Sequence, residues 1–150
     1  MYCKYILCFL LFNFLFVACP AQTTKLSFLS TKFNRVSVKS APSHNSVVKW
    51  VFIYKNEPLK IIAEFDNWRK IVDITNESGW VHITCLSDKQ FVIICKKEKL
   101  LYKNPENNSI ILARLKPGVR CKIEKSLTEW SKISIKGYKG WITNCDLWGS

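Results

Sequence analysis

An internal repeat constrains the fold of this chain more than any other feature of its sequence. The first copy carries, in order, Val36-Ser37-Val38-Lys39, Ser46-Val47-Val48, Pro58, Trp68-Arg69-Lys70-Ile71 and Gly79-Trp80-Val81. The second carries Leu101-Tyr102-Lys103, Ser109-Ile110-Ile111, Pro117, Trp130-Ser131-Lys132-Ile133 and Gly140-Trp141-Ile142. The paired tryptophans are 12 residues apart in the first copy and 11 in the second. Two copies of roughly 50 residues therefore fill most of the chain, as in proteins built from repeated units.

Each copy has the sequence pattern of β-structure. Ser131, Ile133 and Ile135 alternate with polar or charged residues, which is the two-residue period of a half-buried strand. Residues 136–140 contain two glycines and predict a turn, and residues 76–79 occupy the same place in the first copy. Beyond the first 22 residues, no stretch has a helical period with capping residues. We therefore predict an all-β fold with two tandem small domains, each a barrel or a sandwich.

The tryptophans are the first candidates for core positions. A domain of about 55 residues buries only a modest fraction of its surface, so its core needs large side chains. Four of the six tryptophans occupy matching places in the two copies. Core or barrel-rim packing is therefore expected at both hairpins, and the predicted structural core is Trp68, Ile71, Trp80, Trp130, Ile133 and Trp141.

These motifs resemble the bacterial SH3 domain family, in the tandem form of exported alphaproteobacterial proteins. The resemblance is carried by the ordered recurrence of the Val-x-Val-Lys, Trp-x-x-Ile and Gly-Trp-Val/Ile segments, and it spans residues 34–149. It implies two five- to six-stranded barrels, over 34–90 and 91–150, after a short segment at 22–33. It also implies a protein that binds or targets rather than catalyses, because many relatives serve near peptidoglycan, often beside a hydrolase domain.

The first 21 residues have the pattern of a secretory signal peptide. Lys4 is followed by an apolar run and then by the small residues Ala18, Cys19 and Ala21. Residues 1–21 are therefore expected to direct export to the periplasm or cell envelope. Cys19 also lies in a segment similar to a lipobox, so lipidation of Cys19 is the alternative to plain cleavage. Membrane attachment is expected only through that lipid or through an uncleaved signal.

The remaining sequence is strongly basic and contains four cysteines. The formal net charge of the chain is +12, which favours polyanionic partners such as acidic wall polymers, anionic lipid or nucleic acid. The even number of cysteines permits disulfides in three connectivities, and reduced thiols remain the equal alternative. These cysteines are Cys85, Cys95, Cys121 and Cys145.

The sequence contains no recognisable catalytic or cofactor-binding motif. His44 and His82 are the only histidines, and His82 and Cys85 are three residues apart, which would place them on opposite faces of one strand. There is no phosphate-binding Gly-rich loop, nucleophile elbow or metal-ligand cluster. We therefore expect no enzyme activity, no cofactor and no metal site.

Binding is the remaining function, and two places stand out as candidate sites. Ser46 to Pro58 is 12 residues whereas Ser109 to Pro117 is eight, so the first copy has room for a loop that exposes aromatic residues. The candidate ligand-binding residues are Trp50 and Tyr54 in that loop, and Tyr138 with its neighbours Lys136 and Lys139 at the second hairpin. The alternative for Trp50 is a strand that packs on the core.

These observations favour a non-catalytic envelope module that recognises peptidoglycan or an envelope protein. A basic surface would attract stem-peptide carboxylates, and aromatic side chains would supply contact area. The alternatives are a basic single-stranded nucleic-acid binder and a structural or assembly protein of the envelope. The sequence does not indicate an oligomeric state.

Overall fold

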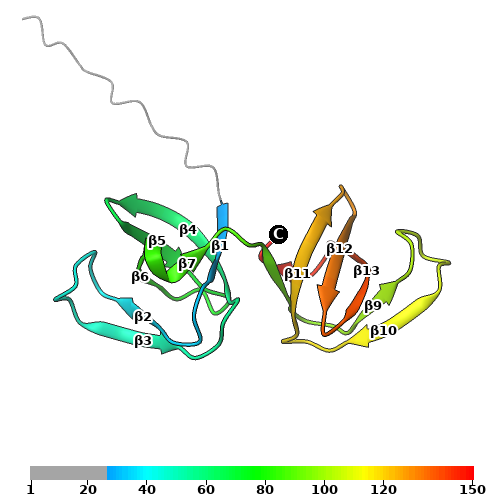
Figure 1. The fold of residues 1–150 in the computed structure, drawn as a ribbon, viewed down its shortest axis with the longest axis horizontal. Coiled ribbons are helices and arrows are strands. Elements are labelled where there is room, and N and C mark those ends of the chain that lie inside the picture. Colours follow the sequence, from blue (N-terminus) through cyan, green and yellow to red (C-terminus); the bar gives the residue numbers. More distant parts are fainter. Residues whose placement is uncertain (1–26) are drawn as a thin grey trace, which may run out of the picture.

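The computed structural model describes residues 27–150, which form two β domains side by side (Figure 1). The predicted signal peptide at 1–21 and the candidate lipidation site Cys19 lie outside the described residues. Within the described part of the chain, no helix is long and apolar enough to cross a membrane.

The first domain is one seven-stranded antiparallel sheet with the strand order β3-β2-β6-β5-β4-β1-β7. One short 3-10 helix, η1 (Ile83–Cys85), precedes the last strand. The strands are β1 (Ser27–Thr31), β2 (Val36–Lys39), β3 (Val48–Phe52), β4 (Pro58–Phe65), β5 (Trp68–Val72), β6 (Ser78–His82) and β7 (Leu86–Ser87).

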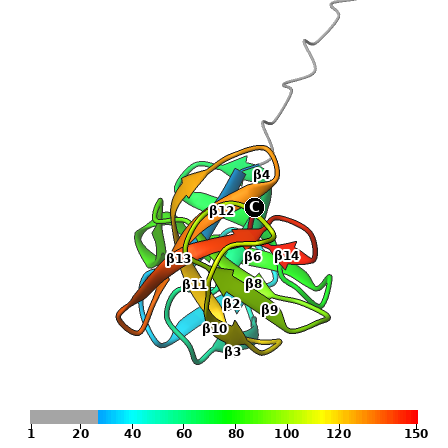
Figure 2. The same ribbon diagram turned by 90° about the vertical axis from the view of Figure 1, so that its right-hand side faces the viewer.

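The second domain repeats this topology strand for strand. Its order is β10-β9-β13-β12-β11-β8-β14, which is the first order with each strand replaced by the one seven places later. In Figure 2, where the second domain faces the viewer, its strands curl around a common centre. They are β8 (Phe91–Ile94), β9 (Lys99–Tyr102), β10 (Ile111–Leu115), β11 (Arg120–Ser126), β12 (Trp130–Ile135), β13 (Tyr138–Thr143) and β14 (Leu147–Trp148).

The strand registers match as closely as the order does. Trp68 pairs with His82 in the first domain, and Trp130 pairs with Thr143 in the second. Ile71 likewise pairs with Gly79, as Ile133 pairs with Gly140. The prediction of an all-β fold with two tandem barrel domains is confirmed.

The first repeat begins earlier than the sequence landmarks indicate. Strand β1 lies in the segment 22–33 that was expected to precede the first barrel, yet it pairs with both β4 and β7. Its counterpart β8 pairs in the same way with β11 and β14. The repeated motifs in the sequence start only at Val36, so they do not include β1. This strand joins the sheet by pairing with residues that are distant in the sequence.

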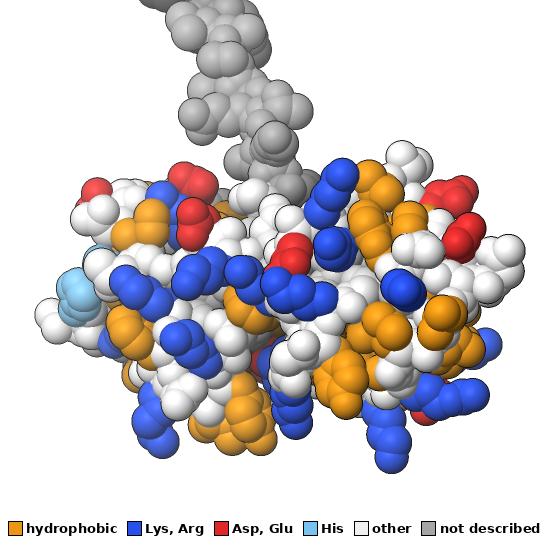
Figure 3. Space-filling model, turned by 45° about the vertical axis from the view of Figure 1, so that its right-hand side comes forward, with side chains coloured by type: hydrophobic (Ala, Val, Ile, Leu, Met, Phe, Trp, Pro, Cys, Tyr) orange, Lys and Arg blue, Asp and Glu red, His pale blue; other side chains and the backbone are white. Residues whose placement is uncertain are grey.

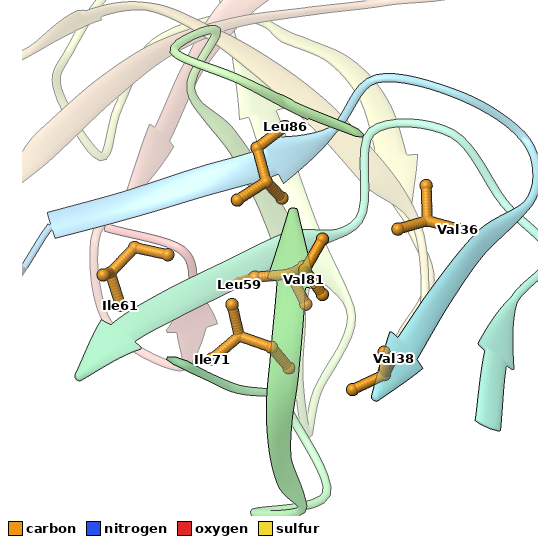
Figure 4. Packing of buried hydrophobic residues seen from close by; sticks show 7 residues of the cluster. All are labelled: Val36, Val38, Leu59, Ile61, Ile71, Val81 and Leu86. Atoms are coloured by element: carbon orange, nitrogen blue, oxygen red, sulfur yellow. The ribbon is translucent and has the colours of Figure 1, made fainter. Parts of the chain in front are cut away.

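Each domain has its own aliphatic core. Ile71 and Ile133 have no exposed surface and lie in the two core clusters, as predicted from their shared position. The seven residues of the first cluster come from β2, β4, β5, β6 and β7, and Figure 4 shows them gathered in one core. They are Val36, Val38, Leu59, Ile61, Ile71, Val81 and Leu86. The second cluster consists of Val92, Ile94, Leu101, Leu115, Cys121, Ile133 and Ile142.

Of the four repeated tryptophans, Trp68 is buried and the other three lie at the edges of the cores. Trp68 is buried, with its ring 5.1 Å from the rings of both His44 and His82. Trp80, Trp130 and Trp141, which were expected in the core, are only half-buried and belong to neither cluster. Successive side chains of a strand point to opposite faces. The residue after each Gly-Trp pair, Val81 or Ile142, therefore takes the inward position, and the tryptophan covers the rim.

The equivalence of the two cores predicts equal sensitivity to truncation. Ile71→Ala and Ile133→Ala should each lower the free energy of unfolding by about 2–5 kcal/mol, because each leaves a cavity in a fully buried cluster. Ile110→Ala is the matched control: its side chain is 64% exposed, so we expect a change within about 0.5 kcal/mol. Urea denaturation measures the free energy of unfolding of the core variants and of the control. A core variant as stable as the Ile110 variant would contradict this assignment.

Candidate binding site between the two domains

An ion pair joins the two domains. Arg120, the first residue of β11, donates from Nε to Glu57 Oε2 at 2.6 Å, and its terminal nitrogen lies 2.5 Å from the same oxygen. Glu57 is buried and precedes β4, so this contact links residues 63 positions apart. The Arg120 guanidinium also stacks on the Tyr54 ring, 4.8 Å from its centroid. A buried carboxylate requires such a partner, because a charge removed from water without one is costly.

The last strand completes the junction. Trp148 Nε1 donates to the carbonyl oxygen of Pro58 at 2.8 Å, and the Trp148 ring packs edge-on against Phe28 at 5.3 Å. The next residue, Gly149, has φ +109°, and a Cβ there would collide with Phe91 O and crowd Pro58. Glycine is therefore required where β14 leaves the second sheet and meets the first domain.

Two adjoining pockets lie along this junction, each of about 600 Å³. The first is lined by both domains, from Thr31 and Lys55 on one side to Phe91 on the other. The second is lined mostly by the second domain. They share Asn56, Phe91 and Lys122, so they adjoin, and we call the pair of them the junction groove.

The junction groove is strongly basic. Six exposed lysines line it, and none forms an ion pair within residues 27–150: Lys32, Lys55, Lys89, Lys116, Lys122 and Lys136. Asp88 is the one acidic side chain in the lining. In Figure 3, Lys and Arg side chains also gather across the middle of the molecule, over both lobes. Unpaired ammonium groups around a depression concentrate anions there and can donate charge-assisted hydrogen bonds to carboxylates or phosphates.

The structure places Trp50 away from this groove. Trp50 lies in β3, half-buried against the first core, with its ring 6.1 Å from that of Phe52. The first copy does not have the longer connection that the sequence indicated, because Pro58 aligns with Arg120 rather than with Pro117. The registers show this: Leu59 and Cys121 pair with the equivalent residues of β1 and β8. The segment from Ser46 to Pro58 is therefore only one residue longer than its counterpart from Ser109 to Arg120.

The other predicted site residues are divided between the groove and its surroundings. Lys136 lines the groove, and Tyr54, which is 57% exposed, reaches it through its contact with Arg120. Tyr138 is equally exposed but begins β13 outside the lining, after a two-residue turn in which φ is positive at Lys136. Lys139 is paired with Glu124 at 3.3 Å.

Sequence reasoning missed most of the groove residues. Lys32, Lys55, Lys89 and Lys122 belong to no motif, although Lys122 occupies the position that Lys60 has in the first copy. The only sequence signal for them was the overall positive charge. The four cysteines are free in the structure, and within 27–150 no cluster of three or more His, Cys, Asp or Glu is arranged to hold a metal ion.

The duplicated sheets and the pocketed junction define a tandem β-barrel protein with a groove between its domains. The model of the bacterial SH3 domain family matches residues 32–88 and again residues 96–149. The chain belongs to the bacterial SH3 domain family. A search of curated proteins found no match.

Solved structures to which the chain is similar include two NlpC proteins and an NlpC/P60 family protein. NlpC2 from Trichomonas vaginalis is 15% identical with a TM-score of 0.38, over 83% of this chain and 48% of that one. NlpC1 from the same organism is 14% identical with a TM-score of 0.38, over 85% and 47%. An NlpC/P60 family protein from Bacillus cereus is 15% identical with a TM-score of 0.36, over 81% and 56%. The chain thus spans about half the length of the solved structures it matches.

Removal of the junction carboxylate should destabilise the protein. Glu57→Gln leaves Arg120 without its counter-charge, and we expect the free energy of unfolding to fall by about 1–3 kcal/mol, since Arg120 is partly solvated. Glu98→Gln, which breaks an exposed pair with Arg114, should change it by less than about 1 kcal/mol. Equal effects of the two substitutions in urea denaturation would contradict the role given to Glu57.

Proposed function

We propose that this protein is a non-catalytic binding module of the bacterial cell envelope, and that its junction groove holds peptidoglycan through the carboxylates of the stem peptides. The observation that carries the proposal is the set of six exposed lysines, none of them in an ion pair within residues 27–150, around two adjoining pockets. The predicted signal peptide at residues 1–21 supports export to the envelope.

The shape and the charge of the groove fit a short anionic peptide better than a flat polymer surface. Each pocket is large enough for a few residues, and concave sites of several hundred Å³ are typical of small-ligand recognition. Lysines at both ends can meet carboxylates several residues apart along a stem. Phe91 and the stem of Lys122, shared by both pockets, supply apolar contact between them.

Membership of the bacterial SH3 domain family also supports binding rather than catalysis. A role as a single-stranded nucleic-acid binder would need aromatic platforms on which bases stack. Phe91 is the only aromatic residue that lines the groove in the described structure, and it is half-buried. The positive charge of the groove would suit peptidoglycan or a single-stranded nucleic acid, so a competition experiment is needed to distinguish these two ligands.

Sedimentation with purified bacterial sacculi tests the proposal. The protein should co-sediment at low ionic strength, and less of it should do so at high salt, because screening weakens contacts between exposed charges. Lys55→Glu combined with Lys122→Glu should weaken binding at least about tenfold, equivalent to about 1.4 kcal/mol. A single-stranded oligonucleotide in equal charge concentration should not release the bound protein.

The matched control changes the same net charge elsewhere. Lys97→Glu combined with Lys103→Glu alters two exposed lysines that do not line the groove, and it should leave sedimentation nearly unchanged. Equal loss in both double variants would show that net charge, not the groove, governs binding. Absence of sedimentation at low salt, or full release by the oligonucleotide, would overturn the proposal.

A further inference from the structure

The two domains differ at one core position in a way that points to a reactive thiol. Val36 in β2 pairs with Phe52, and the equivalent residue of β9, Lys99, pairs with Leu115. Val36 is fully buried in the first core, and Lys99 is only 8% exposed. The second domain therefore holds an ammonium group at the position where the first holds an aliphatic side chain.

This buried lysine has no carboxylate partner. None of the ion pairs within residues 27–150 includes Lys99. Its Nζ instead donates to Cys145 Sγ at 2.8 Å and to Thr143 Oγ1 at 3.1 Å. A buried ammonium without a counter-charge is costly, and the thiolate form of Cys145 is the one anion these contacts can supply.

Cys145 is also the one exposed cysteine among the four in the described residues. It is exposed and lines a pocket of about 340 Å³ together with Trp130 and Asn144. The hydrogen bond from Lys99, with a smaller one from Thr143, lowers the pKa of the Cys145 thiol. Burial has the opposite effect on Cys121, whose pKa it raises to about 11, and it also raises the pKa of Cys95.

We propose that Lys99 and Cys145 form an ammonium–thiolate pair, and that Cys145 is the site at which this protein forms mixed disulfides with disulfide-bearing molecules in its surroundings. In the reaction, the Cys145 thiolate attacks one sulfur of the incoming disulfide. A new S–S bond forms to Cys145, the old S–S bond breaks, and the other sulfur leaves as a thiolate that takes a proton from water. The overall exchange needs no further oxidant.

The first domain offers an internal reference for this site. Cys145 lies two residues after Thr143, and Thr143 is equivalent to His82 because both pair with the matching tryptophans. Thr84 is therefore the counterpart of Cys145, and it makes the corresponding contact with His82 at 2.8 Å. A cysteine placed at Thr84 would be a similarly exposed thiol whose domain has Val36 in place of the lysine.

The test is the rate at which each cysteine of the purified protein forms a mixed disulfide, read by mass spectrometry of its peptides. Oxidised glutathione, which is anionic, and cystamine, which is cationic, are used in parallel. Cys145 should react at least about tenfold faster at pH 7 than Cys121 or Cys95, because the thiolate is the nucleophile. The pH at which its rate reaches half of its maximum should lie below that of an ordinary thiol.

Two variants isolate the contribution of the lysine. Lys99→Val, which introduces the residue of the first domain, should slow Cys145 about tenfold with both reagents and move its pH profile upward. Thr84→Cys in a chain that also carries His82→Thr and Cys145→Ser should react at the slow rate, because His82→Thr removes the imidazole that contacts position 84 and introduces the residue of the second domain. It tests the idea even if the Lys99 variant does not fold. Unchanged Cys145 reactivity in Lys99→Val, an equally fast cysteine at position 84, or a loss confined to the anionic reagent would overturn the proposal.

Discussion

The contact between the Glu57 carboxylate and the Arg120 guanidinium is the interaction on which the binding groove depends. Without a link between the domains, the two pockets that share Asn56, Phe91 and Lys122 would not form one surface. The Glu57 side chain is buried, so its desolvation must be offset by a partner, and Arg120 is the cation in contact with it. The hydrogen bond from Trp148 to Pro58 and the packing of Trp148 on Phe28 reinforce the same junction.

The junction arises from differences between two otherwise equivalent domains. Arg120 begins β11 at the place where Pro58 begins β4, so a residue without a charge or an N–H in one copy corresponds to the bridging cation in the other. Lys99 in the place of Val36 is a second such difference. The shared strand order preserves the two cores. The bridging arginine and the buried lysine both occur at positions where the two copies differ.

The aromatic residues illustrate why strong sequence signals did not mark the candidate site. The four hairpin tryptophans recur at matching places, yet Trp80, Trp130 and Trp141 shield the rims of the barrels, and small aliphatic residues fill the core clusters. Trp50 packs on the first core from β3. In a barrel of this size the interior is narrow, so β-branched and leucine side chains fit where an indole does not. The groove is lined instead by lysines, which have no periodic pattern.

The sequence by itself determined the class of fold, the duplication and the basic character of the protein, because strand alternation and repeated landmarks are local properties of the chain. It also placed Ile71 and Ile133 in the cores and indicated Lys136 as a candidate contact. The tertiary structure alone decided that β1 belongs to the first sheet, that Glu57 meets Arg120 across 63 positions, and that Lys99 meets Cys145 across 46. These long-range contacts depend on how the curved sheets pack and on which side chains that packing removes from water. The spacing of residues along one strand contains neither kind of information.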